Sequence, residues 1–467
     1  MTSLSKFVGK FLETRNLCVN CVKQGALLLS LASASFAGGL MHNTNQSVDF
    51  VRNFAQDAAT GAHAAYYNPA GLAFGSQGFH IALHNQTILQ TRTVTAKGLG
   101  EYEGESFVPA MPSFFIDWHH GDWNVYGGFM IVGGGGSAKF DDGLPMIDAM
   151  LSQILGASLS QNEQLGALMK AADLSAMDLY NASFEGTQYI FGFTLGGAYK
   201  INDMFSVSLG ARFNYATNNY KGEMESTEAL EGAVSKTPLP DEVKAGIKKT
   251  LYATLNQELL DVDQSGFGIT PIVGVHFRYK NLDASVKYEH NTYLEVENDT
   301  KKIADAVGKA LPQFLDGKKS DNDMPGFLSV GVNYAWFPWL RTSAGYHHYF
   351  DKLANYSGDK DDKLDHNEHE AVFGVEVDPL TWLTVSAGVQ KTFYGLTDEY
   401  IEDMSFNLDS WSFGGGFAFK CTNWLSVQLG YMITIYDEWN KVDALTKLPT
   451  EYDRTSQNIA VGLNFEF

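Results

Sequence analysis

Three segments of the chain alternate regularly between large apolar residues and small or polar residues. In residues 205–215, 425–434 and 459–467, one parity holds side chains such as Phe205 and Val207, and the other holds mostly serine, glycine, glutamine or asparagine. A period of two places successive side chains on opposite faces of a β-strand. Large apolar residues suit contact with lipid, and the smaller residues suit a lumen. The pattern therefore predicts the strands of a transmembrane β-barrel.

The lengths of the connections predict the topology. Short polar links occur at residues 119–122, 201–204, 280–283, 337–340, 378–381 and 421–423, and long connections fall near residues 96–106, 137–186, 221–264, 299–325, 353–367, 395–407 and 437–453. Such alternation is typical of outer-membrane barrels, whose short turns face the periplasm and whose long loops face outward. We therefore predict an all-β fold: a transmembrane antiparallel β-barrel of about 14 strands, with both chain ends on the periplasmic side. The barrel is expected to occupy residues 76–467.

The C-terminal segment and the tryptophans agree with a membrane barrel. The last ten residues, NIAVGLNFEF, alternate and end on an aromatic residue, which looks like the signal that the outer-membrane assembly machinery reads. The alternative is the terminal strand of a soluble β-sandwich. Aromatic rings with one polar edge favour the level of the lipid headgroups. We therefore predict a periplasmic aromatic girdle from the tryptophans beside the short links: Trp118, Trp123, Trp336, Trp339, Trp382 and Trp424.

Two of the long connections carry helical periodicity. Residues 142–180 and 238–261 space leucine, isoleucine, methionine and alanine as on one face of a helix, with Pro145 and Pro238 near their starts. We predict helical extracellular loops, whose apolar faces either pack on each other over the barrel mouth or bind an apolar molecule there. The acidic segment 359–365 is expected to be a solvated loop, because it lacks the spacing of an EF-hand.

Composition narrows the function and the location. The 467 residues carry a formal net charge of −21, which argues against a nucleic-acid partner, because phosphate binding needs a basic patch. Residues 1–37 have basic residues ahead of a small-residue-rich apolar run, and they predict a secretory signal peptide. Cleavage of this peptide would remove Cys18 and Cys21, and Cys421 would then be the one cysteine left in the chain. No metal or cofactor is expected, and no later apolar run reaches the roughly 18 residues of a membrane helix.

Residues 38–75 lie between the predicted signal peptide and the first strand, and they join no strand pair. They mix small residues with Phe50, Phe54, Tyr66 and Tyr67. A free tail would be more charged and poorer in aromatic residues, whereas this composition suits close packing. We therefore predict an N-terminal luminal hatch, or plug, inside the barrel.

A short motif closes this segment. Residues 57–60 together with Tyr67, Asn68, Pro69, Ala70 and Gly71 resemble the N-terminal hatch of the FadL/TodX family of outer-membrane transporters for hydrophobic compounds. The resemblance implies passive uptake of hydrophobic molecules, long-chain fatty acids above all, by a monomer in contact with the lipids of a Gram-negative outer membrane. It also implies that the hatch shifts to release the ligand, and we expect these five residues to act in that gating.

The resemblance further implies an inward kink in the third strand that opens a gap in the wall. Here the third strand contains Gly133, Gly134, Gly135 and Gly136, which permit a kink or bulge but also fit a flexible strand end.

Parity places three cations in the lumen as candidates for contact with a ligand carboxylate: Arg212, Lys287 and Arg341. Equally, each of them can pair with an inward acid such as Asp283, Glu289 or Glu376. Phe50 and Phe54 are candidates for contact with the apolar part of a ligand.

Other classes of protein fit less well. A general porin needs an open lumen with charges of both signs, which the predicted hatch would obstruct. An enzyme is not expected, since no GxSxG or HExxH motif occurs in the sequence. A surface adhesin or receptor that uses the long acidic loops stays open as an alternative or an added role.

Overall fold

The computed structural model describes residues 40–160, 175, 177–236, 240–403 and 405–467. The predicted signal peptide lies outside these ranges, as do the first two residues of the predicted hatch. Within the described residues, no helix combines the length and the hydrophobicity that crossing a membrane requires.

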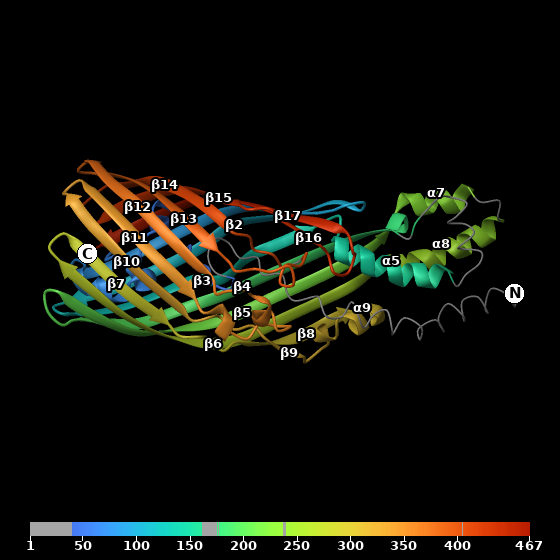
Figure 1. Cartoon of the computed structure of the whole chain (residues 1–467), viewed down its shortest axis with the longest axis horizontal. Helices are drawn as coiled ribbons and strands as arrows, with labels where there is room; N and C mark the ends of the chain where they lie inside the picture. Colours follow the sequence, from blue (N-terminus) through green and yellow to red (C-terminus); the bar gives the residue numbers. More distant parts are fainter. Residues whose placement is uncertain (1–39, 161–174, 176, 237–239, 404) are drawn as a thin grey trace.

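One antiparallel sheet dominates the chain and closes on itself (Figure 1), because β1 pairs with β17 along its whole length. The strands assigned within the described residues are β1 (Gly78–Ala96), β2 (Gly100–His120), β3 (Trp123–Phe140), β4 (Tyr180–Lys200), β5 (Phe205–Ser226), β6 (Gln257–Tyr279), β7 (Leu282–Glu289), β8 (Glu295–Ile303), β9 (Lys319–Asp321), β10 (Phe327–Phe337), β11 (Leu340–Tyr349), β12 (His369–Leu380), β13 (Leu383–Phe393), β14 (Ser410–Lys420), β15 (Leu425–Tyr436), β16 (Trp439–Val442) and β17 (Pro449–Glu466).

The 17 strand segments of this sheet make a 14-stranded barrel, because three positions in the wall are each divided into two segments. Strands β7 and β8 both pair with β6, and β15 and β16 both pair with β17. Strand β9 pairs with β8, and β10 pairs with β7, so these two also share one position. The prediction of a 14-stranded antiparallel barrel is confirmed.

All six predicted short links are turns, but several predicted long connections are too long. Residues 96–106 were expected to form a loop, whereas β1 ends at Ala96 and β2 begins at Gly100. Likewise β3 runs to Phe140 and β5 to Ser226. The strands continue because their alternation persists beyond the apolar zone: Tyr220 and Met224 are buried, while Lys221, Glu223 and Glu225 are exposed.

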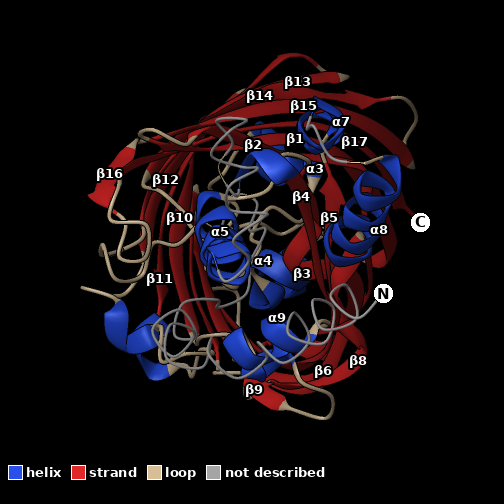
Figure 2. Cartoon of the chain, turned by 90° about the vertical axis from the view of Figure 1, so that its right-hand side faces the viewer, coloured by secondary structure: helices blue, strands red, loops and turns tan. Residues whose placement is uncertain are grey.

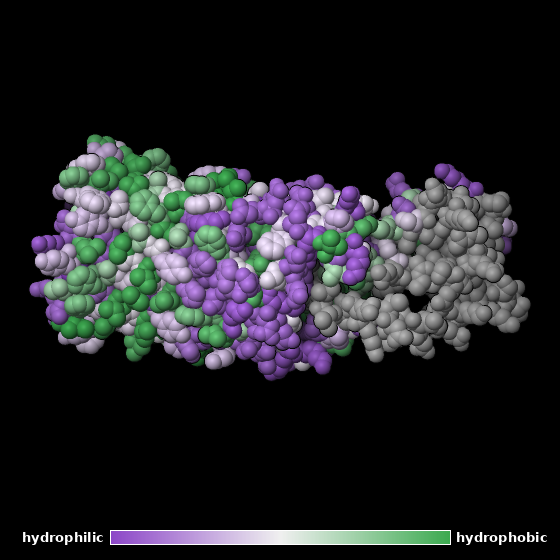
Figure 3. Space-filling view, in the orientation of Figure 1, coloured by the Kyte–Doolittle hydropathy of each residue, from purple (hydrophilic) through white to green (hydrophobic). Residues whose placement is uncertain are grey.

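The outer surface divides into an apolar part and a charged part. On β5 the outward residues are apolar from Phe205 to Tyr215 and then become charged at Lys221 and Glu223. Figure 3 shows hydrophobic side chains gathered over the part of the barrel nearer the C-terminus and hydrophilic ones toward the helices. The predicted girdle tryptophans beside the short turns are all exposed: Trp118, Trp123, Trp336, Trp339, Trp382 and Trp424. An exposed apolar belt of this kind is suited to lipid.

Helices cover the end of the barrel opposite the short turns (Figure 1). They are α5 (Pro145–Ser160), η3 (Met177–Leu179), α7 (Glu228–Lys236), α8 (Asp241–Leu255), α9 (Asp305–Ala310), η4 (Pro312–Phe314), η5 (Asp351–Leu353) and η6 (Asp361–Lys363). Met146 and Leu151 of α5 belong to one buried cluster with Phe140, Leu255 and Phe314. The helical loops are confirmed, and their described apolar residues pack on one another. Residues 161–174 and 176, within the first predicted helical loop, lie outside the described residues.

The segment that precedes β1 lies inside the ring of strands (Figure 2). We call residues 40–75 the luminal segment. It contains three short helices, α3 (Val48–Arg52), α4 (Ala64–Tyr67) and η2 (Pro69–Phe74), and none of its residues pairs in the barrel wall. Most of its side chains are buried, including Phe50 and Phe54.

Candidate functional site in the barrel lumen

Helix α3 is the centre of the luminal segment. The side chain of Ser47 caps it by accepting a hydrogen bond from the backbone N–H of Phe50 at 3.1 Å. Phe50 and Phe54 meet edge to face with their ring centroids 5.1 Å apart, and Phe50 stacks on Tyr67 at 5.8 Å. The two phenylalanines predicted to contact a ligand therefore pack within the luminal segment itself.

The inner wall carries glycine where α3 and the residues after it approach most closely. A Cβ atom on Gly331 or Gly345 would collide with the side chain of Asp57, and one on Gly414 would collide with the backbone oxygen of Val51. We call this set the glycine belt: Gly331, Gly345, Gly374, Gly388, Gly414, Gly416, Gly430 and Gly462. It spans β10 to β15 and β17, and it gives the luminal segment a closely fitting seat.

Buried charges anchor the luminal segment to the same wall. Arg52 donates hydrogen bonds to Glu376 and to Ser386, each at 3.0 Å. Asp57 lies 2.9 Å from Nε2 of His347, whose Nδ1 is 2.8 Å from Glu370. A buried charge is costly unless it is paired, so these contacts hold α3 and Asp57 in place.

The motif that resembles the FadL/TodX hatch forms the last turn of the luminal segment. The Nδ2 atom of Asn68 donates to the backbone oxygen of Ala59 at 2.9 Å and lies 2.8 Å from Nδ1 of His276. Pro69 begins η2, where its fixed φ suits a first helical position. Gly71 has no room for a side chain, because a Cβ would collide with Ala59 and Asn68. The oxygen of Ala70 accepts from Ser206 at 2.6 Å, which joins the turn to β5.

Two tyrosines connect this turn to the start of the luminal segment. The hydroxyl of Tyr66 donates to the backbone oxygen of Asn43 at 3.2 Å, and that of Tyr67 donates to Thr44 at 3.0 Å. The Tyr67 oxygen also accepts from the backbone N–H of Gln46 at 3.0 Å. The position of residues 43–46 is thereby tied to the turn.

The barrel wall is interrupted between β2 and β3. The two strands pair at both ends of their length, but no pairing joins them between Glu105 and Phe114 on the β2 side. Two register shifts toward β4 bracket Val132 and Gly135. Gly134 and Gly135 have φ of +64° and +136°, a region that favours glycine. The four glycines lie within β3, which continues to Phe140, and so they are not a strand end.

Residues 43–46 lie across this interruption, and we call them the bridging segment. The backbone N–H of Asn43 donates to the oxygen of Val132 at 2.7 Å, and Nε2 of Gln46 donates to Ile131 at 2.7 Å. On the other side, Ser113 of β2 donates to the oxygen of Gln46 at 2.5 Å. The bridging segment thus supplies partners that a continuous β2–β3 ladder would otherwise supply.

The three cations predicted to face the lumen do so, and all three are paired with acids. Arg212 and Lys287 both contact Glu289, the latter at 2.8 Å. Lys287 also donates to the backbone oxygen of Tyr66 at 2.7 Å. Arg341 lies 2.6 Å from Asp378. The structure therefore places these cations in ion pairs, which was the alternative to contact with a ligand carboxylate.

The bridging segment and the glycine belt were not predicted. The polar stretch that contains Asn43 and Gln46 has no periodicity, so nothing in the sequence marks it as a wall contact. The glycine belt did leave a signal, because glycines such as Gly430 and Gly462 recur at inward parity. Glycine weakens a strand interior, and its repetition there indicates that another backbone approaches.

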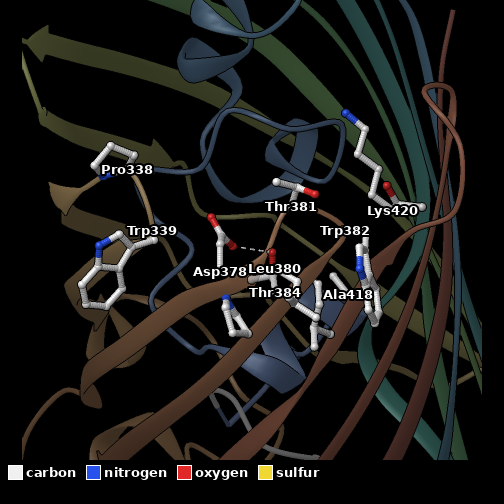
Figure 4. Close-up of a pocket in the computed structure, with 12 residues that line it drawn as sticks. Pro338, Trp339, Asp378, Leu380, Thr381, Trp382, Thr384, Ala418 and Lys420 are labelled. Carbon is white, nitrogen blue, oxygen red and sulfur yellow. Dashed lines mark hydrogen bonds between the residues drawn. The ribbon is translucent and has the colours of Figure 1, made fainter.

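A hollow of about 730 Å³ opens among the short turns at the other end of the wall (Figure 4). Trp339, Trp382 and Lys420 line it together with Asp378, which accepts a hydrogen bond from Thr384 at 2.6 Å. These residues lie in or next to the turns between β10 and β11, between β12 and β13 and between β14 and β15, so the hollow lies at the rim of the barrel.

Solved structures share this architecture. A FadL homologue from Pseudomonas aeruginosa superposes with a TM-score of 0.62 at 13% identity, covering 92% of this chain and all of its own. The toluene transporter TodX from P. putida has a TM-score of 0.53 at 13% identity, with coverages of 88% and 98%. The toluene transporter TbuX from Ralstonia pickettii has a TM-score of 0.52 at 12% identity, with coverages of 93% and 99%.

The chain has the FadL/TodX fold. At 12–13% identity the likeness concerns the fold, and it agrees with the resemblance carried by Asn68, Pro69 and Gly71. No protein-family model and no curated protein matches the sequence. Within the FadL/TodX fold of this chain, the turn at Asn68, the bridging segment and the interrupted wall at Gly134 form one hydrogen-bonded unit.

Proposed function

We propose that the protein is an outer-membrane channel for the passive uptake of hydrophobic molecules, with long-chain fatty acids as its substrates. The observation that carries this proposal is the combination of a filled lumen with an interrupted wall. The luminal segment obstructs a straight aqueous path, whereas the interruption between β2 and β3 is closed by the bridging segment rather than by a strand. The likeness to a FadL homologue and to toluene transporters supports the same class of substrate.

The proposed uptake needs no energy source. An apolar molecule that leaves water for the buried cluster of the loops or the lumen gains about 25 cal/mol for each Å² it buries. It then moves down its concentration gradient when the luminal segment shifts. The turn at Tyr67, Asn68, Pro69, Ala70 and Gly71 acts as the anchor about which the shift occurs, because it holds the bridging segment through the tyrosine hydroxyls.

A general porin is the weaker candidate. Its solutes are polar and need a continuous aqueous path, which the luminal segment obstructs with buried contacts to strands on several sides of the barrel. No contact of the described residues favours an adhesin or receptor. We also propose that the protein is a monomer and that it is located in the outer membrane of a Gram-negative bacterium.

The decisive experiment reconstitutes the full-length protein in liposomes and compares labelled oleate with a labelled disaccharide of similar mass. We expect saturable binding and uptake of oleate with no flux of the sugar. Sugar flux without oleate binding would replace the proposal with a porin. Uptake of toluene in preference to oleate would keep the channel but change its substrate.

The turn offers a second test. Asn68→Ala removes the hydrogen bond to Ala59 and the contact with His276, and Pro69→Ala frees the start of η2. We expect both variants to assemble as barrels, as judged by heat-modifiable electrophoretic mobility, but to take up oleate several-fold more slowly. Uptake at the wild-type rate in both variants would mean that the turn is only a linker.

A further inference from the structure

A chain of four polar side chains joins the last turn of the luminal segment to the short link between β6 and β7. Nδ2 of Asn68 lies 2.8 Å from Nδ1 of His276, whose Nε2 lies 2.8 Å from Oδ1 of Asp283. Asp283 also accepts from Nε of Arg278, its cross-strand partner, at 2.6 Å. Arg278 in turn donates from Nη1 to the backbone oxygen of Phe74 at 3.0 Å. Asn68 and Phe74 are the two ends of η2, so the three wall residues, which we call the clamp, hold both ends of this helix.

Phe74 is held by its ring as well as by its backbone. The guanidinium carbon of Arg278 lies 5.0 Å from the ring centroid of Phe74. Nζ of Lys200, which pairs with Asp203 at 2.9 Å, lies 5.5 Å from the same centroid. Cations are attracted to the face of an aromatic ring, so these contacts fix the end of η2 that Arg278 also holds by its hydrogen bond.

The contacts of the clamp determine where its protons lie. The backbone oxygen of Ala59 can only accept, so the side-chain atom of Asn68 that lies 2.9 Å from it is the amide NH2 group. The same group faces Nδ1 of His276, which must therefore accept and carry no proton. The carboxylate of Asp283 accepts from the other ring nitrogen. The geometry thus requires a neutral His276 with its proton on Nε2.

A second proton, on Nδ1, would break this arrangement. The new N–H would point at the NH2 group of Asn68, and two donors cannot bond to each other. Rotating the amide gives no alternative, because its oxygen would then face the oxygen of Ala59. Gly71 encloses the amide closely, since even a Cβ atom there would collide with both Asn68 and Ala59. A protonated His276 would therefore keep Asp283 and lose its contact with the turn.

Two charged groups act directly on the ring of His276. The ring is fully buried, and its cross-strand partners are the neutral residues Ser206 and Ser285. Asp283 contacts the ring and favours a positive charge on it, whereas burial and the nearby Arg278 oppose that charge. Asp283 is therefore the group that would balance a proton taken up by His276.

We propose that the clamp positions the last turn of the luminal segment only while His276 is neutral, so that acid loosens the turn and slows uptake. His276, Asp283 and Arg278 are positioning residues, which act on the transported molecule through η2. The effect on uptake rests on the proposed function, because Asn68→Ala removes the same contact and is expected to slow uptake. The loosening of the turn needs no ligand.

The first measurement is hydrogen exchange of the amides of residues 70–75 in the reconstituted full-length protein without ligand. It covers pH 5 to 7.5, where histidine titrates, and is corrected for intrinsic exchange. We expect wild-type protection to fall about tenfold toward pH 5, the value of one lost hydrogen bond in a buried setting. His276→Gln should remove the fall, because an amide can accept from Asn68 and donate to Asp283 at every pH. His290→Gln, at an exposed histidine, is the matched control and should keep the wild-type profile.

Asp283→Asn gives a test that does not depend on the glutamine variant. Its side-chain oxygen can still accept from Nε2 of His276, but the charge that would balance a protonated ring is gone. The midpoint of the fall should therefore move about one pH unit lower. A merely structural role would lower protection at every pH and leave the midpoint unchanged. If His276→Gln does not fold, this shift decides.

Uptake of oleate over the same pH range completes the experiment. Wild-type uptake should fall several-fold from pH 7.5 to pH 5 relative to His276→Gln, a comparison that cancels the titration of oleate itself. Parallel uptake profiles in the two proteins would overturn the effect on uptake. An exchange profile shared by the wild type and His276→Gln, or an unchanged midpoint in Asp283→Asn, would overturn the clamp and leave the proposed function standing. Absence of oleate uptake at every pH, with the expected exchange profiles, would remove the proposed function and leave the clamp.

Discussion

Two sides of the barrel wall hold the luminal segment in different ways. On the side of β10 to β17, the wall is a continuous ladder whose glycine belt receives the segment, and the ion pair of Arg52 with Glu376 secures it. On the side of β2 and β3, the ladder is interrupted, and backbone groups of the wall bond directly to Asn43 and Gln46.

The two sides of the wall are suited to different roles. The continuous side anchors α3, and the interrupted side is suited to opening. Shape complementarity and buried charges resist any movement of α3, because moving it would leave Glu376 and Asp57 poorly paired in a buried setting. The bridging segment is held by a few hydrogen bonds that water can replace at a cost of about 1 kcal/mol each. We therefore propose that a small shift on the β2–β3 side would uncover the interruption in the wall while α3 stays in place.

The largest expected effect concerns the anchor on the continuous wall. Among the described residues, Arg52→Ala leaves Glu376 with Arg341 at 3.5 Å and the hydroxyl of Ser386 at 2.9 Å, and should weaken docking of α3 by about 3 kcal/mol. Hydrogen exchange of the amides of residues 48–54 measures this loss directly. Lys139→Ala, which removes an exposed pair with Asp141, is the control and should leave the exchange of these amides almost unchanged, because solvent screens an exposed ion pair. Similar exchange in both variants would show that the ion pair does not anchor the segment.

A pH experiment tests the contact that joins the two walls at the helix-covered end. Asp403 lies in a long loop. Its carboxylate accepts a hydrogen bond at 2.8 Å from the backbone N–H of Met146, which follows β3 in the chain, and another at 2.9 Å from the hydroxyl of Tyr452 on β17. Burial raises the pKa of Asp403 to about 6. The folded state therefore binds the proton of Asp403 more tightly than the unfolded state does. The stabilisation of the folded state by this proton is complete below about pH 4 and is lost as the pH rises through about 6.

Between these pH values, the free energy of unfolding should fall by about 2–3 kcal/mol, and the Asp403→Asn variant should show a smaller fall. Protection of the first-turn amides of α5, corrected for intrinsic exchange at each pH, gives the measurement. Burial also raises the pKa of Asp351, so some dependence should persist in the variant. A profile identical to that of the wild type would mean that Asp403 does not carry the effect.

The glycine belt gives the next effect. Gly414→Ala forces a methyl group against the backbone of α3 and should destabilise docking by about 1–3 kcal/mol. Gly415→Ala is a matched control on the neighbouring position, where the nearest atom would lie at 3.2 Å. Thermal melting and exchange of α3 amides should distinguish the two. Equal behaviour would indicate that the belt reflects strand geometry alone.

The smallest effect is expected on the interrupted wall. Gln46→Ala removes the side-chain hydrogen bond to Ile131 and should cost about 1 kcal/mol. Because α3 stays seated, we expect faster uptake of oleate with the disaccharide still excluded. Slower uptake, or sugar leakage, would contradict the separation of anchoring from opening.

The outer face of the barrel could be predicted from the sequence, because the residues of each strand differ according to the environment that they face. Alternation in segments such as 205–215 requires only that one side meets lipid and the other a lumen, and the short links are local turns. The limits of the strands were less readable. Lys221 and Glu223 are charged as loop residues are, yet their strand continues because Tyr220 and Met224 are buried under the helices.

The contacts on the inner face could be predicted from the sequence only in part. Parity placed Arg212, Lys287 and Arg341 in the lumen, but it could not tell a ligand contact from an ion pair, because Glu289 and Asp378 come from different positions in the chain. The contact of Asn68 with His276 has the same origin, since the two residues lie far apart in the chain and meet only when the barrel encloses the luminal segment.

The sequence by itself determined the 14-stranded antiparallel barrel and its short turns, and it set residues 38–75 apart as a segment that joins no strand pair and ends in a rigid turn. These features follow from short-range periodicity, local turn chemistry and composition. The tertiary structure alone decided where that segment sits and what it touches: Val51 against Gly414, Arg52 against Glu376, and Asn43 against Val132. These contacts join residues far apart in the chain, and no local pattern encodes which strand a folded segment will meet.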